Sequence, residues 1–272
     1  MRISFIIPRQ FSQTVIPRQF SQTYAGTVPA AITIENLEVR YDDHIALSGV
    51  DLSVPAAGSL AIIGPNGSGK STLLGALAGT ISPTRGKATV SNPPPALVLQ
   101  STVVDKSLPL TVRDAVSMAR YPTLGLFGKF RAADHEAVDK ALVSMAIDDL
   151  AGRQLHDLSG GQRQRVLVAQ GLAQDADVLL LDEPVVGLDV PSRALILETI
   201  DEELSAGRAV VVTTHSLDDA RRCDQVLLLD TTPVALGPPS HVLTEGHLRQ
   251  AFGEQFVRVG DGLILDDPHH HH

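Results

Sequence analysis

The sequence predicts an α/β fold in which helices cover both faces of a mostly parallel sheet. Wholly apolar runs of four residues recur at 60–63, 178–181, 209–212 and 226–229, as expected of buried parallel strands. Segments with helical periodicity lie between several of these runs, and a glycine-rich segment at 64–72 directly follows the first. Alternating buried strands and helices are typical of open parallel sheets, which bind ligands at the carboxyl ends of their strands.

Composition narrows the class of protein. The 272 residues can form one large domain or a domain with a smaller one inserted, and 43% of them are apolar. A net charge of −9 and few aromatic side chains argue against a nucleic-acid partner. The single cysteine, Cys223, excludes an intrachain disulfide, fits a reducing compartment and is expected to be structural. No apolar run reaches the roughly 20 residues of a membrane span, so we expect a cytoplasmic chain that needs a partner for any membrane role.

Residues 30–255 are expected to form the ordered domain, with a tail at each end. Residues 1–29 contain a short tandem repeat, 7–14 and 16–23, which predicts a flexible tail or an artefact of expression. Residues 256–272 form the predicted C-terminal tail, and its final histidines, 269–272, fit either a purification tag or a metal-binding tract.

The elements follow in order. Residues 32–39 and 47–54 are predicted strands, and the buried strand 60–63 leads through the glycine-rich segment into a helix at 71–78. Residues 97–99 predict a further buried strand with Gln100 at its carboxyl end. Helical periods at 112–119 and 133–146 mark residues 101–165 as an inserted helical subdomain.

The glycine-rich segment fits the phosphate-binding pattern G-x-x-x-x-G-K-[ST] in a strand–loop–helix context. Its backbone amides and the dipole of the following helix attract phosphates, Lys70 supplies a charge for the β/γ-phosphates, and the Ser71 hydroxyl suits Mg²⁺. The residues expected to bind the nucleotide are Gly64, Pro65, Asn66, Gly67, Ser68, Gly69, Lys70, Ser71 and Thr72.

Polar residues follow other buried strands. Asp182 and Glu183 should emerge beside the phosphate loop, where Asp182 suits the Mg²⁺ shell and Glu183 can act as general base on water. His215 follows the strand at 209–212 and is predicted to contact the γ-phosphate or the attacking water. Weaker signals come from Gln100, whose amide suits Mg²⁺ or that water, and Tyr41, whose ring suits stacking on adenine.

A second glycine-rich segment, Leu158-Ser159-Gly160-Gly161-Gln162, opens a predicted helix. A hydroxyl, exposed amides and a helix dipole form a second anion site there. Because one chain has one triphosphate loop, we expect this segment to complete the site of a second copy, head to tail, in a symmetric dimer.

Taken in order, these motifs resemble the ATP-binding subunit of an ABC transporter over about residues 32–236. In that resemblance Gln100 is the Q-loop glutamine, Tyr41 the A-loop aromatic residue and His215 the switch histidine, and Asp189 in Gly187-Leu188-Asp189 is the D-loop aspartate. The family implies a P-loop NTPase (RecA-like) core, an antiparallel β subdomain and an inserted α-helical subdomain. It also implies ATP and Mg²⁺ as cofactors, ATP hydrolysis coupled to transport, and a place at the cytoplasmic face of the membrane.

The family's partners are a second copy of the subunit, integral membrane permease subunits and, indirectly, a periplasmic or lipid-anchored solute-binding protein. This chain departs from the family at Ser216, where Asp is usual, and at Gln170-Gly171, where Arg-Ala is common. Neither departure removes a predicted catalytic group.

The transported substrate is predicted from residues 108–114 and 118–125, which resemble zinc and manganese importers more closely than siderophore and haem importers. A siderophore or haem importer and an ABC exporter remain alternatives. A soluble ABC ATPase of DNA repair or translation is disfavoured by the lack of long heptads and of a second cassette. A module that only senses ATP is disfavoured because both Glu183 and His215 are present.

Overall fold

A computed structural model of the chain describes residues 29–100, 109–124, 128–253, 256–259 and 262–265. Its centre is a six-stranded sheet in the order β5-β6-β7-β3-β8-β9, in which the first five strands are parallel and β9 is antiparallel to β8. The mostly parallel sheet is therefore as predicted. The strands are β3 Ser59–Ile63, β5 Ala96–Val98, β6 Val178–Asp182, β7 Ala209–Thr213, β8 Gln225–Asp230 and β9 Thr232–Gly237.

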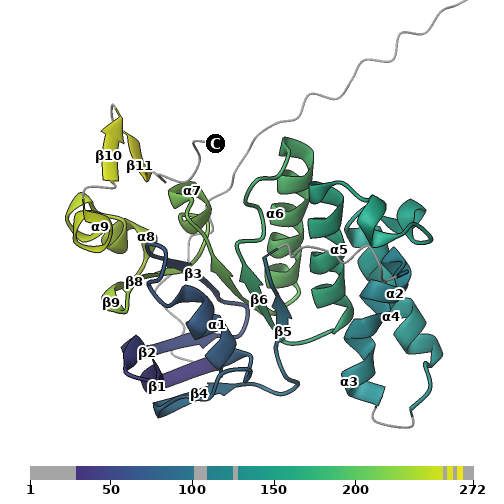
Figure 1. Ribbon diagram of the computed structural model, residues 1–272, viewed down its shortest axis with the longest axis horizontal. Helices are drawn as coiled ribbons and strands as arrows, with labels where there is room; N and C mark the ends of the chain where they lie inside the picture. The colour runs from purple at the N-terminus through teal and green to yellow at the C-terminus, as the bar shows by residue number, and fades with distance from the viewer. Residues whose placement is uncertain (1–28, 101–108, 125–127, 254–255, 260–261, 266–272) are drawn as a thin grey trace, which may run out of the picture.

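The two faces of this sheet pack into separate apolar cores because successive strand residues point to opposite sides. In β3, Leu60 and Ile62 join one core, and Ala61 and Ile63 join the other. The first core lies under α1 (Lys70–Leu77) and a three-stranded antiparallel sheet, β2-β1-β4, formed by His44–Pro55, Ala30–Tyr41 and Arg85–Val90. The second lies under α5 (Gly160–Ala173) and α6 (Val190–Ser205), so α1 and α5 cover opposite faces (Figure 1).

The helical insertion contains α2 (Val112–Ser117), α3 (Tyr121–Leu124) and α4 (Ala132–Ser144) beside α5, on the right of Figure 1. Arg120 pairs with Asp134 at 2.9 Å and donates to the Ala173 carbonyl at the end of α5, which ties the insertion to the core. Because α5 runs continuously from 160 to 173, the predicted boundary at 165 falls inside a helix. Among the described helices, none is both long enough and apolar enough to span a bilayer.

Several elements were not predicted. Strand β4 has mostly exposed or half-exposed residues and lacks an apolar run, so its pattern gave no signal. Helices α7 (Leu217–Ala220), α8 (Pro239–Val242) and α9 (Glu245–Phe252) are short. The segment expected to be a C-terminal tail contains a hairpin, β10 (Phe256–Val259) and β11 (Gly262–Leu265), because each short run can pair with the other. The tandem repeat and the terminal histidines lie outside the described residues.

Candidate active site

The phosphate loop connects β3 to α1 and depends on glycines at three positions. Gly67 and Gly69 have φ of 81° and 97°, in the left-handed region that side chains disfavour. At Gly64 a side chain would not fit, since a Cβ would lie 2.0 Å from the Leu229 carbonyl oxygen. A Cβ on Gly69 would also lie 2.5 Å from the backbone oxygen of Ala46. The loop therefore brings its backbone close to neighbouring segments, a shape suited to an anion.

Lys70 is buried at the start of α1, and its Nζ donates to the carbonyl oxygens of Gly64 at 2.8 Å and Pro65 at 3.0 Å. Burial lowers the pKa of Lys70, while the nearby carboxylates of Glu183 and Asp182 partly offset that effect. Among the described residues this buried ammonium bonds only neutral carbonyls directly, so it is well placed to exchange them for phosphate oxygens.

Three oxygen-bearing side chains meet where β6 and β7 end beside α1. Ser71 donates to Oδ2 of Asp182 at 3.0 Å, and Thr213 donates to Oδ1 of Asp182 at 2.6 Å. Hard oxygen ligands of this kind suit Mg²⁺, which keeps several waters and shares the substrate's phosphates. Of the three predicted metal ligands, Ser71 and Asp182 therefore fit a Mg²⁺ site, whereas the Gln100 amide donates to Glu183. The Thr213 hydroxyl fixes the orientation of the Asp182 carboxylate.

Glu183 is held by residues from the ends of two other strands, β5 and β7. Its Oε2 accepts a hydrogen bond from Nε2 of Gln100 at 3.2 Å, and its Oε1 lies 2.5 Å from Nε2 of His215. Its backbone N–H donates to the Thr213 hydroxyl at 2.9 Å. Glu183 also has a φ of 48°, an unusual conformation for a residue with a side chain, and such strain concentrates at functional sites.

The structure thus brings together most of the predicted site: the phosphate loop, Asp182, Glu183, Gln100 and His215. The prediction missed Thr213, which is fully buried and contacts both acidic residues. Its position at the end of β7, two residues before His215, is the signal that could have identified it. Tyr41 is about half exposed (48%) at the end of β1, and its stacking role stays a prediction.

The second glycine-rich segment forms the capped start of α5. Ser159 Oγ accepts from the Gln162 N–H at 3.2 Å, and Gln162 Oε1 accepts from the Ser159 N–H at 3.0 Å, a capping box that fixes the first turn. A Cβ on Gly161 would lie 2.6 Å from Oδ1 of Asp189, the N-cap residue of α6. Hydrogen bonds from Ser192 lower the pKa of Asp189, so its carboxylate stays charged beside Gly161.

The two glycine-rich segments are not joined within one chain. They begin helices on opposite faces of the sheet, and among the described residues no hydrogen bond or ion pair links 158–162 to 64–72. Unlike a Cβ on Gly161, a Cβ added to Gly160 would have open space around it, as expected of a segment that faces outward.

Strand–loop–helix geometry, the buried lysine and the acidic strand end define the class of protein as a P-loop NTPase. The match to a family model is more specific: residues 47–186 match the ABC transporter family. The chain belongs to this family, and it is an ATPase whose hydrolysis is coupled to transport.

Relatives agree with this assignment. The chain is 34% identical over 240 residues to the manganese transport system ATP-binding protein MntB of Listeria innocua, covering 85% of this chain and 100% of that protein. It is 39% identical over 248 residues to the hemin import ATP-binding protein HmuV of Streptomyces coelicolor, covering 86% of this chain and 88% of that protein. Among solved structures, a chain of a metal-chelate type ABC transporter in an inward-facing conformation matches with a TM-score of 0.75 and 30% identity, covering 87% of this chain and 96% of that chain.

Proposed function

We propose that the chain powers the import of a transition-metal ion, manganese or zinc, by hydrolysing ATP in sites shared between two copies. The contact of Glu183 with both Gln100 and His215 carries the catalytic part of this proposal. A carboxylate held between an amide and an imidazole at the edge of a phosphate site is placed to accept a proton from the attacking water.

Each residue has a defined role in the proposed reaction. Lys70 and the amides of the phosphate loop hold the phosphates and neutralise their charge. Ser71 and Asp182 would hold Mg²⁺, which would neutralise negative charge on the phosphates. Gln100 and His215 orient the water and contact the γ-phosphate, and Glu183 takes the proton.

The second half of each site comes from another copy. The capped start of α5 offers the Ser159 hydroxyl and the amides of Gly160 and Gly161, groups that can donate hydrogen bonds to an anion. Two copies arranged head to tail would close two identical sites, as a two-fold symmetric dimer requires. The outward position of Gly160 and its separation from Lys70 within one chain support this arrangement.

The proposed partner in the membrane is a permease, which would hold the chain at the cytoplasmic face. Large apolar side chains are exposed at Leu99, next to Gln100, and at Met118 and Tyr121 in the helical insertion. Exposed apolar residues suit contact with another protein, and Leu99 adjoins a residue of the proposed site. A solute-binding protein would deliver the ion to that permease.

Manganese or zinc as substrate rests on the resemblance of residues 108–125 to importers of these ions and on the similarity to the manganese transport protein. Leu108 and Gly125, which belong to the segments that carry that resemblance, lie outside the described residues. Haem is the second candidate, because the identity to the hemin import protein is 39%.

Deleting the gene in its source organism and measuring cellular metals by mass spectrometry separates these substrates. Loss of manganese or zinc, restored by the wild-type gene but not by Glu183→Gln, is the expected result. If cellular manganese and zinc are unchanged and the deletion strain fails to grow on hemin as sole iron source, the transported substrate is haem and not a manganese or zinc ion.

A further inference from the structure

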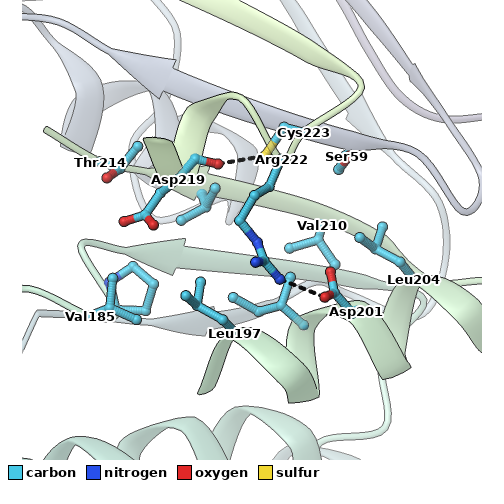
Figure 2. A pocket seen from close by; sticks show the side chains of 13 residues that line it. Ser59, Val185, Leu197, Asp201, Leu204, Val210, Thr214, Asp219, Arg222 and Cys223 are labelled. Carbon is cyan, nitrogen blue, oxygen red and sulfur yellow. Dashed lines mark hydrogen bonds and ion pairs between the residues drawn. The ribbon is translucent and has the colours of Figure 1, made fainter. Parts of the chain in front are cut away.

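Asp189 lies beside the second glycine-rich segment. The proposed catalytic roles do not explain how a movement of Asp189 would change the contact between His215 and Glu183. Asp189 caps the start of α6, and His215 precedes Ser216, the cap of α7. Between these helices lies a pocket of about 30 Å³ with mostly apolar walls, lined from α6 by Leu197, Ile200, Asp201 and Leu204 and from the α7 side by Thr214, Asp219, Arg222 and Cys223 (Figure 2). Side chains therefore do not fill the space between α6 and α7 there.

Two ion pairs bridge this gap. Arg193, in the first turns of α6, lies 2.5 Å from Oδ1 of Asp219 in α7. Arg222, just after α7, lies 2.6 Å from Oδ2 of Asp201 near the other end of α6, the pair drawn across the pocket in Figure 2. The two bridges differ in burial: the Asp219 side chain is 7% exposed, and the Asp201 side chain is 56% exposed.

Asp219 depends on Arg193 for close charge compensation. Its Oδ2 has no hydrogen-bond partner among the described residues, although it is buried. Burial raises the pKa of Asp219, and attraction to Arg193 is the main opposing effect, followed by a hydrogen bond from the Ser216 side chain and by attraction to Arg222. A buried carboxylate holds its nearest cation firmly, because separating the two would leave most of the buried charge uncompensated.

Both ends of the Arg193–Asp219 pair are one helical turn from a loop of the site. The Arg193 N–H donates to the carbonyl of Asp189 at 3.0 Å, and the Asp219 N–H donates to Oγ of Ser216 at 3.2 Å. A continuous set of contacts thus runs from Gly161 through Asp189 and α6 to the start of α7, which follows His215 directly.

We propose that Arg193 and Asp219 are positioning residues. Their ion pair ties the start of α7, which follows His215, to the start of α6, so the location of α6 sets the contact of His215 with Glu183. When a second copy shifts the loop at Asp189, the ion pair moves the start of α7 with it. Neither residue is among those proposed to bind the nucleotide. The inference rests on the proposed catalytic roles of Glu183 and His215.

The test compares the purified full chain carrying Asp219→Asn, Arg193→Met, both changes together, or Arg193→Lys, with ATP and Mg²⁺ as the probe. We expect each neutral single variant to lower kcat about 10-fold and to leave KM for ATP within about twofold, because the chemical step and not binding is affected. The double variant should be no slower than the slower single variant, since both changes break one interaction. Arg193→Lys keeps the charge and should recover most of the loss.

Asp201→Asn is the matched control, because it breaks the exposed ion pair between the same two segments. Its kcat should stay within about twofold of wild type. Unchanged kcat in Arg193→Met, an equal loss in Asp201→Asn, or multiplied losses in the double variant would each overturn the positioning role. The double variant leaves no uncompensated charge on the buried side of the pair, so its kcat decides the matter even if a neutral single variant fails to fold. A wild-type chain that hydrolyses ATP while Glu183→Gln does so equally well would instead refute the proposed catalytic roles.

Discussion

Nε2 of His215 lies 2.5 Å from Oε1 of Glu183, although the two residues follow different strands of the sheet. The other carboxylate oxygen of Glu183 accepts a hydrogen bond from Gln100, which follows a third strand. Parallel strands end at one edge, so three separate sequence segments supply the surroundings of one carboxylate. This arrangement supports the proposed roles, which are proton transfer for Glu183 and orientation of the water for its two neighbours.

Glu183→Gln should lower the hydrolysis rate by about 10²–10⁴-fold, the usual contribution of a general base, because an amide cannot accept the proton. ATP affinity should change little, since Lys70 and the phosphate loop hold the nucleotide. Because hydrolysis is blocked, the variant should form an ATP-dependent dimer that is visible by size-exclusion chromatography. Steady-state phosphate release measures the rate, and Glu202→Gln, at an exposed position of α6, is the control. Hydrolysis at the wild-type rate would show that Glu183 is not the base.

Gly69→Ala should destabilise the fold more than Gly67→Ala. Both positions have positive φ, which costs a side chain roughly 1–2 kcal/mol. Only at Gly69 would the new methyl also meet a backbone oxygen, that of Ala46, at 2.5 Å, whereas nothing lies within 4 Å at Gly67. Urea unfolding measures the free energy of both variants. Equal losses would mean that the loop moves away from Ala46 without cost.

The fold and the ends of the parallel strands could be predicted because buried strands carry their own apolar signal. Asp182, His215 and Gln100 each follow such a run, so their meeting follows from topology. Strand β4 could not be predicted, since Arg85-Gly86-Lys87 shows no apolar alternation and pairs only because β1 lies beside it. The bridging role of Thr213 and the approach of Asp189 to Gly161 depend on tertiary contacts, which no local pattern records.

Cys223 should react slowly with thiol reagents in the folded chain. Burial raises the pKa of its thiol to about 12, and the neighbouring carboxylates of Asp224 and Asp219 add to this effect. At pH 8 the thiolate fraction should rise on the order of 10³-fold when unfolding returns the pKa to about 8.5. Reaction with a chromogenic disulfide in buffer and in guanidinium gives the two rates. Similar rates in both solutions would contradict the burial of this side chain.

The central claim is that each ATP site combines the phosphate loop of one copy with the second glycine-rich segment of another. Two tagged versions of the Glu183→Gln chain, both with Cys223→Ser, would carry Asn66→Cys and Gly160→Cys separately. Asn66 is exposed in the loop, and Gly160 has room for a side chain, so neither change should disturb its own copy.

After mixing these two chains with ATP and Mg²⁺, a short bismaleimide reagent should link them. We expect a covalent dimer that contains both tags, forms only with ATP and is absent when Lys70→Met is added to both chains. The most direct contradiction would come from one chain carrying both cysteines: an internal link in the monomer, with no link between chains in the mixture, would place the complete site within a single copy.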